Sequence, residues 1–139
     1  MRKAQDFADR HRRTRRDHAA ETAEDYVEAI SQVLADKGVC RVVDLARRFD
    51  VSHVTVTKIV SRLKENGLVI SERYKPLELT DAGRRLAERS RQRHEVVYQF
   101  LLAHGVSKAV AATDSEGIEH HVSPETLKAM QSFLDAATA

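Results

Sequence analysis

Hydrophobic residues first repeat with a helical period in the stretch after Thr22. Thr22-x-x-Asp25 opens this stretch, and a hydroxyl residue followed three positions later by an acid is typical of a helix N-terminus. Gly38 comes after the stretch and favours its end. The pattern predicts that ordered structure begins with a helix from Thr22 to about Gly38. The positions spaced to lie on its buried face are Tyr26, Val27, Ile30, Val33 and Leu34.

Two shorter amphipathic segments come next. The first covers 42–49 and breaks at Asp50-Val51-Ser52, where the hydroxyl of Ser52 can cap a second segment that closes at Asn66-Gly67. Two short helices joined by a tight turn predict a helix-turn-helix. The apolar positions are Val42, Val43, Leu45, Ala46 and Phe49 in the first helix, and Val56, Ile59, Val60 and Leu63 in the second.

After Gly67 the pattern changes to that of extended structure. Residues 68–74 and 77–79 predict two short strands, and Lys75-Pro76 predicts the turn between them. A β-hairpin in this place is the wing of a winged helix-turn-helix. The expected fold is therefore mainly α-helical with one small β-hairpin.

Three further helices are predicted after the hairpin. Thr80-Asp81 can cap a long helix over 81–103 that ends near His104-Gly105. A shorter helix starts at Thr113 or Asp114, and another starts at Ser123-Pro124, where a serine precedes proline at the first helical position. We expect these helices to form a C-terminal domain.

Composition narrows the class of protein. Of the 139 residues 42% are hydrophobic, and the chain has no Trp, two Pro and five Gly, which favours a mostly helical protein. The single Cys40 excludes a disulfide framework and a cysteine-based zinc site. No apolar run is long enough to span a membrane, and no hydrophobic stretch resembles a secretory signal. We expect a cytoplasmic protein without a membrane partner.

Charge divides the chain into a basic front part and an acidic back part. Residues 1–94 carry 21 basic and 15 acidic side chains, a sum of +6, whereas residues 95–139 carry two basic and six acidic ones, a sum of −4. Residues 1–16 hold seven Lys and Arg against two Asp, with few apolar residues. We interpret 1–21 as a flexible basic arm, either solubilising or able to contact phosphate. The domains expected after it are 22–80, which binds DNA, and 81–139, which is helical.

Polar and basic side chains occupy the face of the second helix-turn-helix helix that lies opposite its apolar stripe. Residues near the N-terminus of such a helix usually reach base edges in the major groove, whereas later residues and the wing reach phosphates. The predicted base-reading residues are His53, Val54, Thr57 and Lys58, and the predicted phosphate contacts are Thr55, Ser61, Arg62, Lys64, Arg73 and Lys75.

Acidic and histidine residues at helical spacing predict a metal site. Glu116, Glu119 and His120 stand at i, i+3 and i+4, so that on a helix they share one face. Asp25 and Glu28 show the same spacing on the first helix, and His94 lies midway along the long helix. Either acidic pair alone could serve as a helix cap. Four carboxylates that converge with two imidazoles would repel one another unless a cation neutralised them.

The chain resembles the manganese transport regulators, short members of the diphtheria-toxin-repressor family of metal-dependent winged-helix repressors. The resemblance runs from about Glu24 to the C-terminus. It implies a homodimer with a winged helix-turn-helix and a C-terminal dimerisation domain. It also implies a binuclear site, two ions per protomer, on Asp25, Glu28, His94, Glu116, Glu119 and His120. The matching stretches are Glu24-Asp-Tyr-Val-Glu28, Val51-Ser-x-x-Thr-Val-Thr-Lys58, Leu79-Thr-x-x-Gly83, Arg93-His-Glu95 and Glu116-Gly-Ile-Glu-His-His121.

The ligand types favour a hard metal ion. Oxygen-rich sites with few imidazoles and no sulfur suit Mn²⁺, and Fe²⁺ is the competing ion because affinity for the same donors rises from Mn²⁺ to Fe²⁺. The expected function is a Mn²⁺-activated repressor of manganese uptake genes, whose metal clamps the DNA-binding domain to the dimerisation domain for a palindromic operator. The alternatives are an Fe²⁺-responsive repressor and a winged-helix regulator without metal control. Neither an enzyme nor an organic ligand is expected, because no general base or substrate pocket is evident.

Overall fold

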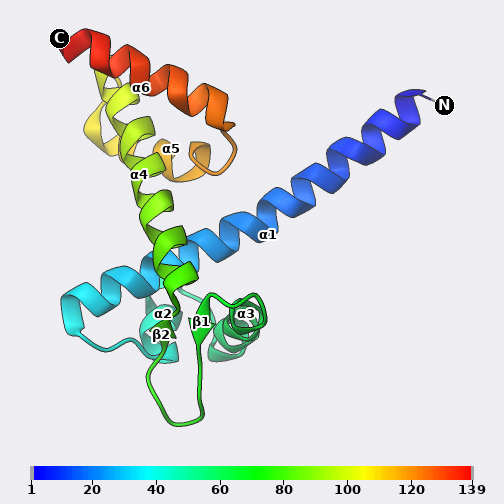
Figure 1. Ribbon diagram of the computed structural model, residues 1–139, viewed down its shortest axis with the longest axis vertical. Helices are drawn as coiled ribbons and strands as arrows, with labels where there is room; N and C mark the ends of the chain where they lie inside the picture. The colour runs from blue at the N-terminus through cyan, green and yellow to red at the C-terminus, as the bar shows by residue number, and fades with distance from the viewer. Residues whose placement is uncertain (1, 139) are drawn as a thin grey trace. The chain divides into compact units, whose positions relative to one another are not determined.

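The computed structural model describes residues 2–138, apart from the side chain of residue 17, and is mainly helical (Figure 1). The chain forms two compact units, one of which is Glu21–Arg89, while the other combines the segment up to Ala20 with the segment from Ser90 onward. Below they are called the 21–89 unit and, after the larger of its two segments, the 90–139 unit. The elements are α1 (Arg2–Lys37), α2 (Val42–Phe49), α3 (His53–Glu65), β1 (Val69–Ile70), β2 (Glu78–Leu79), α4 (Asp81–Ala103), α5 (Lys108–Ile118) and α6 (Pro124–Thr138).

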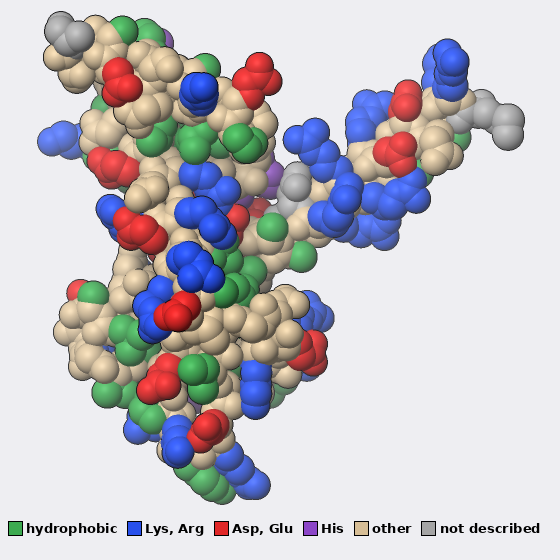
Figure 2. All heavy atoms as spheres, viewed as in Figure 1, with side chains coloured by type: hydrophobic (Ala, Val, Ile, Leu, Met, Phe, Trp, Pro, Cys, Tyr) green, Lys and Arg blue, Asp and Glu red, His purple; other side chains and the backbone are tan. Residues whose placement is uncertain are grey.

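Helix α1 is much longer than its apolar pattern predicts. The expected start at Thr22 is wrong, because the helix begins at Arg2, and the basic arm is its first part. Residues 2–21 contain neither Gly nor Pro and are rich in Ala and Arg, which are strong helix formers. Helix propagation from a formed turn needs no amphipathic stripe, so the packed part of α1 can nucleate the rest. Lys and Arg side chains gather along this first part of the helix (Figure 2).

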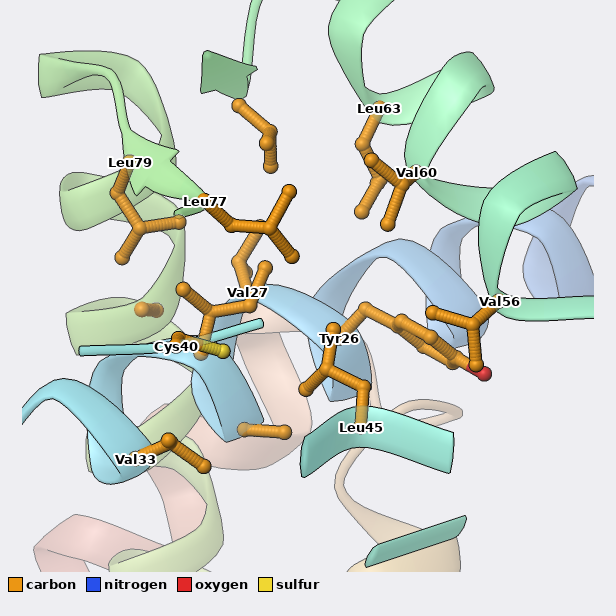
Figure 3. Packing of buried hydrophobic residues seen from close by; sticks show 14 of the residues in the cluster. Tyr26, Val27, Val33, Cys40, Leu45, Val56, Val60, Leu63, Leu77 and Leu79 are labelled. Atoms are coloured by element: carbon orange, nitrogen blue, oxygen red, sulfur yellow. The ribbon is translucent and has the colours of Figure 1, made fainter. Parts of the chain in front are cut away.

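The hydrophobic core of the 21–89 unit contains the positions that the helical spacing marks as buried. Tyr26, Val27, Ile30 and Val33 of α1 are buried against residues of α2, α3 and the hairpin (Figure 3). The Tyr26 ring stacks on Phe49 with the ring centroids 4.3 Å apart. The remaining fully or nearly buried members are Ala29, Cys40, Leu45, Ala46, Val56, Val60, Leu63, Val69, Leu77, Leu79 and Ala87.

Side-chain caps determine where several helices begin. The Ser52 hydroxyl accepts a hydrogen bond from the Thr55 N–H at 3.1 Å, which confirms the predicted cap of α3. Thr80 caps α4 in the same way, through the Gly83 N–H at 3.0 Å. The Ser123 hydroxyl accepts from the N–H of Thr126 at 3.2 Å, at the predicted start of α6. These hydroxyls satisfy backbone donors that would otherwise lack a partner.

The predicted start of α5 at Thr113 or Asp114 is wrong. Ser107 caps this helix by accepting from the Val110 N–H at 3.4 Å, and α5 begins at Lys108. The segment 109–112 is Ala-Val-Ala-Ala, which has high helix propensity but only a weak amphipathic pattern. Thr113 is inside the helix, where its hydroxyl donates to the Ala109 carbonyl at 3.2 Å.

The wing is an antiparallel hairpin of two-residue strands, with Val69 opposite Leu79 and Ile70 opposite Glu78. The sequence predicts the turn at Lys75-Pro76, but in the structure it comes earlier in the chain, at residues 72–75. The Lys75 N–H donates to the Glu72 carbonyl at 3.1 Å, and Tyr74 takes a left-handed conformation with φ of 66°. After the turn, Leu77 forms an isolated antiparallel β-bridge with Cys40, in which the Leu77 N–H donates to the Cys40 carbonyl at 2.8 Å.

Cys40, which forms this bridge with Leu77, is fully buried, and burial raises the pKa of its thiol to about 11. At pH 8 such a pKa lowers the reactive thiolate fraction about 100-fold relative to an exposed cysteine. We expect iodoacetamide to label the native protein at least about 100-fold more slowly than the urea-unfolded protein. Cys40 is the single cysteine, so mass spectrometry of the whole chain measures its labelling directly. Equal labelling rates in the two states would show that this part of the core opens readily.

In the 90–139 unit, α5 and α6 pack along the C-terminal part of α4 (Figure 1). Phe133 of α6 contacts Phe100 and His104 of α4, with ring centroids 5.5 Å and 4.7 Å away. Val97 of α4 and Ala111 of α5 are fully buried, whereas α6 has no buried residue. The larger apolar side chains of α6 are thus half-buried, as are Leu127, Met130 and Leu134, or exposed, as is Phe133. Among the described residues, no helix has the length and apolar character needed to cross a membrane.

Candidate functional site

Helix α3 presents a polar face opposite its buried stripe. Val56, Val60 and Leu63 point into the core, so the residues between them point outward. Val54 is the large apolar residue of the outer face, and 64% of its surface is exposed. A helix whose outer side chains are exposed in this way can enter a groove of about 12 Å width. The exposed side chains on it are His53, Val54, Thr55, Thr57, Lys58, Ser61, Arg62 and Lys64.

Two of these side chains are held by local hydrogen bonds. The Thr55 hydroxyl lies 3.0 Å from the Ser52 hydroxyl at the helix cap. The Lys64 ammonium donates to the Ser71 carbonyl at 2.9 Å, which joins the end of α3 to the wing. Lys64 therefore connects α3 to the wing, a role that its place in the sequence does not indicate.

The wing tip carries two cationic side chains that are both exposed. The Arg73 guanidinium lies 5.0 Å from the centre of the Tyr74 ring, and the Lys75 ammonium pairs with the Glu72 carboxylate at 2.8 Å. Tyr74 is 86% exposed, and no sequence signal singles it out. An exposed ion pair contributes about 0–1 kcal/mol, so Lys75 can exchange Glu72 for a phosphate at little cost.

Helix α1 holds the acidic candidates of the 21–89 unit. Asp25 and Glu28 are half-buried on α1 at i and i+3. Glu21 precedes Asp25 by one turn, and their carboxylate oxygens lie within 4.8 Å of each other. Glu21 is missing from the predicted set, although its i, i+4 spacing to Asp25 is a signal that could have found it.

The other candidates meet around one carboxylate in the 90–139 unit. Glu119 Oε2 lies 3.4 Å from His94 Nδ1, and Glu119 Oε1 lies 3.3 Å from His120 Nε2. The Glu119 and His120 side chains are each only 2% exposed. The far nitrogen of His94, Nε2, lies 3.5 Å from the Ser115 hydroxyl. The fold thus places one carboxylate between an imidazole of α4 and the imidazole of the next residue, in the turn after α5.

Glu116 does not join this group, because its side chain is exposed on α5. The predicted common helical face for Glu116, Glu119 and His120 is wrong at its last member. Helix α5 ends at Ile118, and the Glu119 N–H donates the last helical bond to Ser115 at 3.1 Å. His120 follows in a turn that is closed by the His121 N–H on the Ile118 carbonyl at 3.0 Å.

The donor set fits a divalent metal ion of hard to intermediate character. The carboxylate of Glu119 can bridge two positive centres, and an imidazole nitrogen on each side can complete a ligand set without sulfur. On α1 of the 21–89 unit, Asp25 and Glu28 present carboxylates of their own. No thiol is available, since Cys40 is buried in the core. Oxygen with a few nitrogen donors is the combination expected for Mn²⁺ or Fe²⁺ rather than for a Cys-bound zinc.

Family models match almost the whole chain in two adjoining parts. Residues 18–77 match the iron dependent repressor N-terminal DNA binding domain, and residues 80–138 match the metal binding and dimerisation domain of the same family. The chain is 45% identical over 122 residues to the transcriptional regulator MntR of Escherichia coli O6:H1, covering 88% of this chain and 79% of the relative. It is 43% identical over 100 residues to the regulator MntR of Lysinibacillus sphaericus, covering 72% of each.

Solved structures share the fold. A manganese-dependent transcriptional repressor in complex with manganese is 29% identical and aligns with a TM-score of 0.72 over 81% of this chain and 52% of its own. The manganese regulator SloR is 25% identical with a TM-score of 0.72, over 81% of this chain and 53% of its own. The chain thus spans about half the length of these solved chains.

Proposed function

The chain belongs to the iron-dependent repressor family, and from this membership we propose that it represses manganese uptake genes by binding operator DNA in response to Mn²⁺. The observation that carries the proposal is the buried Glu119 carboxylate between His94 and His120, within a chain 45% identical to an MntR regulator. Members of the family are transcriptional regulators. We propose that the protein acts as a homodimer in the cytoplasm, where bacterial DNA lies.

DNA recognition is assigned to α3 and the wing. His53, Val54, Thr57 and Lys58 lie on the exposed face near the start of α3, where side chains of a recognition helix meet base edges. Val54 supplies a methyl-binding contact for thymine. The proposed phosphate contacts, which set the position of the protein on DNA, are Thr55, Ser61, Arg62, Arg73 and Lys75.

Metal binding is assigned to six side chains that lie on both units. Asp25 and Glu28 belong to the 21–89 unit, whereas His94, Glu116, Glu119 and His120 belong to the 90–139 unit. We propose two ions per protomer, held by these oxygen and nitrogen donors. When bound, the ions would supply the positive charge that offsets repulsion among four carboxylates. Glu116 would have to turn from its exposed position to contribute.

Ligands from two units make the response to metal a switch. With the carboxylates neutralised, the DNA-binding units of a dimer are expected to settle at one separation, about one turn of DNA, which suits a palindromic operator. The coupling between metal and DNA is reciprocal and typically about 1–3 kcal/mol. Fe²⁺ is the second candidate effector, because the same donors bind it more tightly than Mn²⁺.

Capture of genomic DNA tests the proposal directly. Purified protein is incubated with sheared DNA from the source organism in Mn²⁺, in anaerobic Fe²⁺ and in chelator, and the captured fragments are sequenced. We expect one palindromic sequence to be enriched with Mn²⁺ and lost with chelator. Equal enrichment in chelator would overturn metal control and leave a regulator that binds DNA without it. A response to Fe²⁺ alone would reassign the effector.

A further inference from the structure

The N-terminal part of α1 is a regular helix without a hydrophobic stripe. From Arg2 onward it continues the packed helix of the 21–89 unit without a break in its backbone hydrogen bonding. All of its described side chains up to Ala20 are exposed except that of Ala8. Burial in a core therefore does not explain its sequence. Its excess of Lys and Arg is typical of a surface that binds a negatively charged partner.

Three arginines of this segment share one side of the helix. Arg12, Arg15 and Arg16 stand at i, i+3 and i+4, and together they line a hollow of about 380 Å³. We call these three side chains the arginine face. The Arg12 guanidinium pairs with Asp9, but both partners are more than half exposed, so water screens the pair. Arg12 can therefore exchange Asp9 for a stronger anion.

The chemistry of the arginine face matches a row of phosphates. A guanidinium is planar and always charged, and it donates two parallel hydrogen bonds to phosphate oxygens. A preformed helix spaces the three groups before binding, so less conformational entropy is lost than in a disordered arm. No acidic side chain other than Asp9 pairs with these arginines among the described interactions.

We propose that the arginine face binds backbone phosphates of DNA next to the operator and adds affinity without reading sequence. This proposal rests on the DNA binding proposed above. It gives the basic arm a function in a part of the chain that the family models leave out, since the DNA-binding match begins at residue 18. Its signature is a dependence on salt, because every phosphate contact releases counterions.

The test compares two triple variants in Mn²⁺ over a series of salt concentrations. Arg12→Ala/Arg15→Ala/Arg16→Ala removes the arginine face. Arg2→Ala/Lys3→Ala/Arg10→Ala removes the same charge from the same helix away from that face, and Arg10 already donates to the Asp6 carbonyl at 3.3 Å. Fluorescence anisotropy measures the affinity for a long operator duplex. Alanine has the highest helix propensity, and circular dichroism checks that both variants keep the helix.

We expect the arginine-face variant to lower the salt slope, log K against log [salt], by about 2–3 and affinity at 0.15 M salt by about 10- to 100-fold. The control should change the slope by less than about 1. Equal loss in both variants, or no loss in either, would overturn the proposal. So would an unchanged DNA slope with lost binding to anionic phosphatidylglycerol vesicles, since the face would then meet lipid. Metal-independent binding by the wild type would refute the proposed switch while the slopes still decide the role of the arm.

Discussion

Replacing Gly83 by alanine is expected to destabilise the 21–89 unit by about 2 kcal/mol. A Cβ atom at this position would lie 2.1 Å from the Leu68 carbonyl oxygen and 3.2 Å from Leu79 Cδ2. The obstacle is backbone, which cannot turn aside as a flexible side chain can. Overpacking costs about 1–3 kcal/mol, and a contact of 2.1 Å with a backbone oxygen belongs at the upper end of that range. The higher helix propensity of alanine offsets about 1 kcal/mol, which leaves about 2 kcal/mol.

The clash cannot relax without disturbing the hydrogen bonds that connect the wing to α4. The Leu68 carbonyl accepts from the Thr80 N–H at 3.1 Å, and the neighbouring Gly67 carbonyl accepts from the Thr80 hydroxyl at 2.6 Å. The same hydroxyl caps α4 through the Gly83 N–H. Moving Leu68 away from a new methyl group would strain all three hydrogen bonds.

Urea unfolding followed by circular dichroism measures the effect. Gly117→Ala is the matched control, because Gly117 is also helical and a Cβ atom there would meet nothing within 4 Å. The control should be neutral or more stable by up to about 1 kcal/mol, through propensity alone. If the two alanine variants unfolded at the same urea concentration, close packing of α4 against Leu68 would not contribute to stability.

The periodic spacing of hydrophobic residues predicts most of the fold, because in the 21–89 unit the residues at helical spacing are the ones that are buried. Tyr26, Ile30, Val56 and Val60 are buried where the spacing places them. The caps at Ser52 and Ser123 are predicted because a hydroxyl just before an amphipathic run has one obvious partner. Period and capping chemistry are local properties, and a single sequence displays both.

Where the hydrophobic residues have no clear periodic spacing, the predicted element boundaries are wrong. The start of α1 at Arg2 and that of α5 at Lys108 depend on helix propensity, and neither stretch has a strong apolar stripe to reveal it. The wing turn moves because Tyr74 adopts a left-handed conformation, which its residue type does not favour. Each of these differences shifts a boundary and leaves the order of elements unchanged.

Spacing also predicts less of the candidate site than of the fold. The i, i+3 and i+4 pattern groups Glu116 with Glu119 and His120, yet the pair that flanks Glu119 is His94 and His120. His94 reaches Glu119 because α5 packs on α4, which is a tertiary contact between residues 25 positions apart in the chain. The position of Glu116 depends on its solvent-facing place on α5, and a helical wheel cannot show that without knowing which face is packed.

Replacing Glu119 by glutamine is expected to abolish the response of DNA binding to Mn²⁺. The wild type should bind operator about 5- to 150-fold more tightly with Mn²⁺ than with chelator, which is the usual range of such coupling. In Glu119→Gln this ratio should fall to within about twofold of one. Glutamine keeps the size of the side chain but removes the negative charge and one of the two anionic oxygens that face His94 and His120.

Glu95→Gln provides the matched control for the same chemical change. Glu95 is next to His94 on α4, but its side chain is exposed and accepts a hydrogen bond from Gln99 at 2.9 Å. It should keep the full response to Mn²⁺. Titration of free Mn²⁺ by electron paramagnetic resonance, without DNA, separates loss of metal binding from loss of coupling. We expect Glu119→Gln to bind less Mn²⁺ while its thermal unfolding without metal and its DNA affinity in chelator stay near those of the wild type. Undiminished Mn²⁺ dependence in Glu119→Gln would mean that the buried carboxylate only orients two imidazoles, and that the metal response arises from other side chains.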